Sequence, residues 1–163
     1  MRSVLIRTVA LLVLPVLASC GGSDCCSPPS NGDGHFTASV TGAKTASLAG
    51  QAGFLTSANL FSIALRDASS PATFIQISHI GAALPAPGTY SLNPNGDPAQ
   101  AFAVIYSGGG TDNYAGTGGT LTLTAVSGTS VSGNFTFTGT GGSSGAAAVS
   151  VTGHFDATPL TAH

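Results

Sequence analysis

GTLTLTAVSGTSVSGNFTFT, residues 119–138, is the stretch that decides the fold. Leu121 and Leu123 alternate with threonines, and Phe135 and Phe137 do the same after a short loop of Gly, Thr and Ser. Successive side chains of a strand point to opposite faces, so this period of two predicts half-buried strands over 119–127 and 131–138. The short polar loop between them predicts a β-hairpin.

The same alternation recurs on both sides of this hairpin. Apolar residues alternate with small or polar ones over 36–40, 61–65, 75–77, 89–92, 101–106 and 149–155. No segment of the domain carries a helical period. Eight to ten short strands with turn signals between them predict an all-β fold, either an antiparallel β-sandwich or a flattened barrel, and we prefer the sandwich.

The amino-terminal segment has the pattern of an export signal. Arg2 and Arg7 mark a short positive region before an apolar run over 9–17. This run is too short to span a bilayer comfortably. Leu17-Ala18-Ser19-Cys20 follows and resembles the lipobox of bacterial lipoproteins. The resemblance implies cleavage before Cys20 and acylation of its thiol, so that the lipid chains hold the protein at a membrane. The alternative is an ordinary secretory signal that is cleaved near Ala18 or Ser19 and leaves Cys20 as a plain thiol.

The segment GGSDCCSPPSNGDG, residues 21–34, has no periodic apolar pattern and reads as a flexible tether. We therefore expect a signal peptide over 1–19, a lipidated tether over 20–34 and one β-domain over 35–163. Cys25 and Cys26 lie in the tether. Pairing between molecules, free thiols and a strained ring between the neighbours all stay open, whereas two thiols alone are too few for a zinc site.

Several strand and turn motifs together resemble a family of small β-sandwich lipoproteins of uncharacterised role, found in Bacteroidetes-like bacteria. The similarity spans most of 35–158, although Phe36 stands where that family usually has Trp. The resemblance implies the fold and a location in the cell envelope, and it assigns no functional residue to this sequence. The motifs are Thr41-Gly42, Gly88-Thr89-Tyr90, the alternating segments 119–123 and 131–137, and 151–155.

Composition excludes one class of partner. Only 6% of the residues are charged, and the predicted mature chain keeps Lys44 and Arg66 beside six Asp, a net charge of about −4. Nucleic-acid binding requires a row of cations that replaces the phosphate counterions, so we expect no nucleic-acid partner.

No catalytic constellation stands out, and we predict that the protein is not an enzyme and needs no cofactor. His35 and His154 share the threonine side of their strands, and His163 is near the end of the sequence. His79 shares the apolar side but sits at a strand end, which is typical of a boundary residue. No HExxH motif is present, and no G-x-S-x-G turn stands between a strand and a helix, where it would present a nucleophilic serine.

The best candidate for an ion site is a weak one for Ca²⁺. Asn95 and Asp97 lie in one polar loop and Asp112 in another, and Ca²⁺ prefers such oxygen ligands on flexible turns. The pattern of a full calcium-binding loop is missing, and Asn and Asp are also ordinary turn residues. We favour the turn interpretation and predict no metal site.

Threonines recur on one side of the hairpin, at Thr120, Thr122 and Thr124 and again at Thr136 and Thr138. Such a hydroxyl array is typical of ice-binding or adhesive surfaces. Threonine is also a common exposed strand residue, and we prefer this simpler interpretation.

Together these features predict a membrane-anchored lipoprotein of the cell envelope, with the outer membrane preferred as its location. We expect a non-catalytic module for binding, interaction or structure, with an envelope protein or a glycan as partner. The alternative is a lipoprotein that binds carbohydrate or another small ligand, assisted by Ca²⁺. Sugar binding has few aromatic platforms to use, since the chain lacks Trp and has only three Tyr.

Overall fold

The computed structural model describes residues 34–81, 84–93, 101–141 and 147–160, which form nine strands and no helix. All nine strands belong to one compact unit, Asn31–His163. In this part of the chain, no helix has the length and apolar character needed to cross a membrane. The strands are β1 His35–Gly42, β2 Ala46–Ser57, β3 Leu60–Asp67, β4 Thr73–Ile80, β5 Gly88–Ser91, β6 Ala103–Gly108, β7 Asn113–Val126, β8 Val131–Gly141 and β9 Ala147–Pro159.

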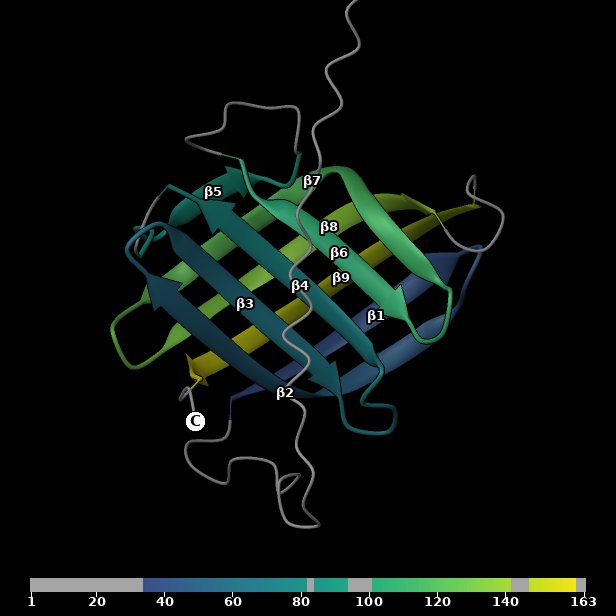
Figure 1. The fold of residues 1–163 in the computed structure, drawn as a ribbon, viewed down its shortest axis with the longest axis horizontal. Coiled ribbons are helices and arrows are strands. Elements are labelled where there is room, and N and C mark those ends of the chain that lie inside the picture. The colour runs from purple at the N-terminus through teal and green to yellow at the C-terminus, as the bar shows by residue number, and fades with distance from the viewer. Residues whose placement is uncertain (1–33, 82–83, 94–100, 142–146, 161–163) are drawn as a thin grey trace, which may run out of the picture. The chain divides into compact units, whose positions relative to one another are not determined.

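The strands form one sheet that closes on itself. Its order is β5-β7-β6-β4-β3-β2-β1-β9-β8, and β8 pairs again with β7, which closes a ring of eight strands. β3, β4 and β6 cross in front of β8 and β9 in Figure 1, so the two halves of the ring face each other across the core. The all-β antiparallel prediction is confirmed. Closure through the β7–β8 pairing matches the flattened-barrel alternative more closely than the preferred sandwich.

The predicted hairpin is confirmed as β7 and β8. Leu121 pairs with Phe135 and Val126 with Val131, and the turn is closed by a 2.8 Å hydrogen bond from the Ser127 amide to the Ser130 carbonyl. β7 begins earlier than predicted, at Asn113. It pairs first with β6 and then with β5, and two register shifts against β8 allow this long strand to bend between them.

Strand β2 has no counterpart in the sequence-based predictions, because its pattern does not alternate cleanly. Ala52, Gly53 and Phe54 are buried in succession. Small residues stand where large apolar ones would reveal a strand, since Gly50 lies opposite Phe36 and the side chain of Leu160 covers Gly53. The side chain that covers Gly53 therefore comes from beyond the end of β9.

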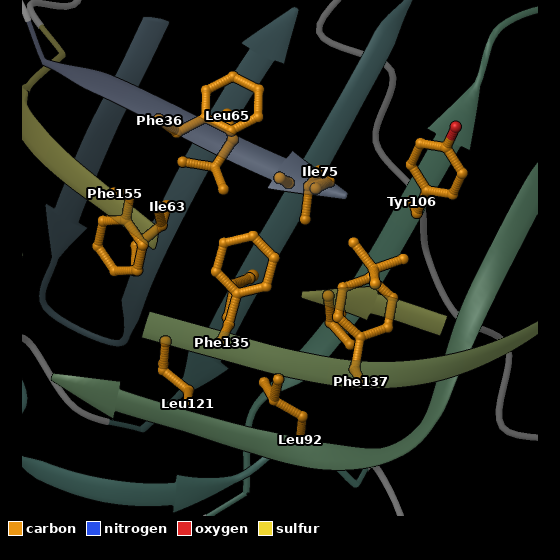
Figure 2. Close-up of a cluster of buried hydrophobic side chains, with 14 of the residues drawn as sticks. Phe36, Ile63, Leu65, Ile75, Leu92, Tyr106, Leu121, Phe135, Phe137 and Phe155 are labelled. Atoms are coloured by element: carbon orange, nitrogen blue, oxygen red, sulfur yellow. The ribbon is translucent and has the colours of Figure 1, made fainter. Parts of the chain in front are cut away.

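Glycines and phenylalanines interlock inside the barrel. Phe135 lies opposite Gly153, and Phe155 lies opposite Gly133 on the same strand pair, so each ring fills the room that a glycine leaves. Figure 2 shows the rings of Phe135 and Phe155 pointing into the space between the strands. Gly133-Asn134-Phe135 and Gly153-His154-Phe155 are therefore complementary halves of one packing arrangement. Full burial of such a ring contributes roughly 1.5–3 kcal/mol.

Candidate functional site

An open groove of about 760 Å³ lies on the outer face of β7, β8, β9, β1 and β2. Alternation places it there, because β1, β7, β8 and β9 send their large apolar residues into the core and their hydroxyl residues outward. Ser47 to Ala49 of β2 continues this alternation at the groove. We call it the polar groove after the hydroxyl, amide and imidazole groups that its strands present outward, although carbon atoms make up most of its exposed lining. It is lined by Thr37, Ala38, Ser39, Ser47, Leu48, Ala49, Thr120, Thr122, Asn134, Phe135, Thr136, Thr152, Gly153 and His154.

The outward side chains of the polar groove form two rows that cross all five strands. Adjacent members of a row are direct cross-strand partners, so their positions are set by the register of the sheet. The Thr136 row consists of Thr120, Thr136, Thr152, Ser39 and Ser47, and the His154 row consists of Thr122, Asn134, His154, Thr37 and Ala49.

Hydrogen bonds between neighbouring side chains fix the geometry of these rows. The hydroxyls of Thr136 and Thr152 are 3.0 Å apart, and the Thr37 hydroxyl lies 3.2 Å from Nδ1 of His154. On the far side of β7, Thr89 of β5 extends the His154 row through a 3.2 Å contact with Thr122. The polar groups are thereby oriented before any ligand arrives, which lowers the entropic cost of binding.

The polar groove carries almost no charge. Among its lining residues there is no Asp, Glu, Lys or Arg, and His154 is the single titratable side chain. One step further along the strands, Nε2 of His35 lies 3.4 Å from the Asp156 carboxylate. Both partners are exposed, so this pair adds little stability. The chemistry that the groove offers is neutral hydrogen bonding.

His35 and His154 are exposed on the outer face, as predicted. His79 is buried, its Nδ1 lies 2.9 Å from the carbonyl oxygen of Ala101, and its ring stacks on Phe102 at a centroid distance of 4.7 Å. These contacts give His79 a packing role at the end of β4, in keeping with the predicted boundary residue.

Asp112 is the one calcium candidate among the described residues, and its carboxylate forms an ion pair with Lys44. Nζ of Lys44 donates hydrogen bonds to Asp112 at 2.9 Å and to the carbonyl of Gly108 at 2.8 Å. The hydrogen bond with Asp112 is the main reason why the pKa of Lys44 is raised. Asn95 and Asp97 lie outside the described residues. Where the chain is described, no three His, Cys, Asp or Glu side chains gather as a metal site would require.

Two buried polar side chains escaped the sequence analysis. The hydroxyl of Tyr106 is enclosed without a hydrogen-bond partner in the described part of the protein, and burial raises its pKa. The Asp67 carboxylate accepts hydrogen bonds from the Ser69 hydroxyl and from the amides of Ala49 and Ser70. The Ser69 bond contributes most to lowering its pKa. Asp67 thus ties the β3–β4 turn to β2.

Cys20, the predicted lipidation site, lies outside the described residues, as do Cys25, Cys26 and His163. Acylation and the export signal therefore stay predictions. The resemblance to small envelope lipoproteins also remains a prediction. Comparison of the chain with protein-family models, with curated proteins and with solved structures finds no match.

Proposed function

We propose that the protein is a non-catalytic binding module of the bacterial cell envelope, anchored by lipid on Cys20, with the polar groove as its contact surface. The observation that carries this proposal is the register of the two rows. It aligns hydroxyl, amide and imidazole groups from five strands into one uncharged surface. Such a surface can bind a polar partner through hydrogen bonds without catalysing a reaction.

The partners of the titratable side chains support a binding role over a catalytic one. Outside the polar groove, Asp67 is held by its turn, Lys44 by Asp112, and His79 by the Ala101 carbonyl. In the polar groove, His154 is exposed and contacts a threonine hydroxyl. A general base normally needs a partner that orients it and a position close to the reacting atom.

The anchor complements an open groove of this kind. Hydrogen bonds that remain exposed to water each add only about 0.5–1.5 kcal/mol, so a single polar groove binds weakly. Many copies held on one membrane raise the effective concentration and give avidity. A lipid-anchored location is therefore the setting in which weak contacts are useful.

The anchor is tested by the intact mass of the protein purified from the membrane fraction of its host, beside a Cys20→Ser variant. We expect a chain that begins at Cys20 and carries acyl groups, and we expect the variant to lose both the acyl mass and the membrane association. An unacylated wild-type protein in the soluble fraction would refute the anchor.

The contact surface is tested by photo-crosslinking in living cells. A benzoylphenylalanine placed at Ser47, in the polar groove, is compared with one placed at Thr140, an exposed residue of β8 outside it. We expect adducts of increased mass from position 47 and few from position 140. Equal labelling at both positions, or none at either, would contradict a binding role for the groove.

A further inference from the structure

The spacing of the polar groups in the groove is that of the sheet itself. Neighbouring strands lie about 4.8 Å apart and alternate residues of one strand about 6.8 Å apart. Five strands therefore give each row a length of about 19 Å, whereas the two rows together are only about 7 Å wide. The groove is long across the strands and narrow along them, which suits an extended chain and not a compact ligand.

Building on the proposed function, we infer that the polar groove binds a neutral polysaccharide chain that lies across the five strands. Hydroxyls both donate and accept hydrogen bonds, as does the side-chain amide of Asn134, so they complement the hydroxyls of sugars in either direction. A threonine side chain also presents a methyl group beside its hydroxyl. This pairing matches the alternating C–H and O–H groups along the edge of a sugar ring.

Charge argues against the other extended polymers of an envelope. Polyanions and phosphate headgroups are bound by Arg and Lys, and none lines the polar groove. The predicted mature chain carries about four net negative charges, which repels polyanions further. Extended apolar peptides are bound through large apolar side chains, and no such side chain points outward from either row, although carbon atoms make up most of the exposed lining.

The groove also predicts the strength of binding. Aromatic platforms that stack on sugar rings are missing from its outward positions, since Phe135 is 2% exposed and its ring lies inside the barrel. Binding then depends on hydrogen bonds that compete with water, so each groove binds weakly. The useful ligand is a polymer with repeated sites, because repetition supplies avidity.

The test is native affinity electrophoresis of the full chain, purified from its host in non-ionic detergent. Gels contain hydroxyethylcellulose, xylan, mannan, dextran or starch as neutral polymers, and polygalacturonate as the anionic one. We expect at least one neutral polysaccharide to retard the protein and polygalacturonate to leave its mobility unchanged. Retardation by polygalacturonate alone, or by none of the neutral polymers, would overturn the inference.

The matched variants remove hydroxyl pairs inside and outside the groove. Thr136→Val with Thr152→Val deletes the pair at the centre of the Thr136 row, and neither hydroxyl is left behind without its partner. The control, Thr117→Val with Thr138→Val, deletes a similar pair at 3.3 Å on β7 and β8, outside the groove lining. We expect affinity to fall about tenfold in the first double variant and to stay within about twofold in the control. Equal effects in both would overturn the assignment to the groove.

The crosslinked adducts separate this inference from the proposed function. Adducts from position 47 that stain for carbohydrate and collapse after glycosidase digestion support a polysaccharide. Adducts that contain another protein, a phospholipid or a second copy of the chain retain the binding role and overturn the polysaccharide. Without any adduct at position 47, the proposed function itself fails.

Discussion

The two faces of the β8–β9 ladder are held by different forces. On the inner face, Phe135 and Phe155 fit over the glycines of the opposite strand, and a change of one methyl group alters the packing. On the outer face, Thr136 and Thr152 share a hydrogen bond in contact with water. The same ladder therefore separates stability from recognition. Close packing on the inner face stabilises the fold, and the exposed hydroxyls on the outer face are available to a ligand.

The largest effect is expected from Phe135→Ala on the inner face. It removes a ring that is 2% exposed and stacks near Phe137 and Phe155, with ring centroids 6.2 and 6.3 Å away. The lost contacts and the cavity should lower the free energy of unfolding by about 3–5 kcal/mol, measured by urea denaturation. A loss below about 1 kcal/mol would show that the inner face is not the stabilising one.

Gly153→Ala adds a methyl group to the same face. A Cβ there would lie 2.5 Å from the carbonyl oxygen of Thr37, 2.6 Å from the Phe135 ring and 2.8 Å from Cβ of Ala38. We expect a loss of about 2–3 kcal/mol from overpacking. Gly118→Ala is the control, because a Cβ at that glycine has open space around it. Similar melting temperatures for the two variants would contradict the interlocked packing.

Asp67→Asn tests how much a buried carboxylate contributes to the free energy of unfolding. The carboxylate has a lowered pKa, so it stabilises the folded state above its unfolded pKa of about 3.9, and this contribution is lost as pH falls through the lower folded pKa. We expect the variant to lose about 1.5–3 kcal/mol at pH 7. The difference from wild type should shrink in denaturation curves as the pH falls below about 4. A difference that stays constant with pH would count against the ionised carboxylate.

The smallest effect on stability is expected for Thr136→Val combined with Thr152→Val. Both residues are exposed strand positions, and valine keeps their shape and their preference for strands. The free energy of unfolding should change by less than about 0.5 kcal/mol while polysaccharide binding falls. A double variant that unfolds easily would show that the outer face also carries the fold, and the contrast between the faces would be lost.

The sequence predicted much of the fold because its strongest signals are local. The alternation over 119–138 predicted the hairpin, and the alternation at 61–65 and 75–77 predicted β3 and β4. Strand β2 escaped, because Gly50 stands at an inward position where a large side chain would reveal a strand, and the outward Gly53 is buried under Leu160. The residues that lie opposite or over these glycines, Phe36 and Leu160, belong to distant segments and cannot be recognised from β2 alone.

The candidate site was visible only in part. The threonines of β7 and β8 were noticed as an array, and the simpler interpretation was preferred because exposed strands commonly carry threonine. The groove forms only where the outward residues of β9, β1 and β2 lie beside those of β7 and β8. Thr37 and His154, which share a hydrogen bond there, are 117 positions apart in the sequence. No local pattern could have placed them side by side.

The sequence by itself determined which side chains share a face, because the period of two follows from the geometry of one strand. It also determined that few side chains carry a charge, since only 6% of the residues are charged. Only the tertiary structure decided which strands are neighbours and in what register. Those pairings depend on closure of the ring around one core, where β8 meets β7 and β1 lies between β9 and β2. The two rows of the polar groove exist because long-range pairing aligned five separate alternations.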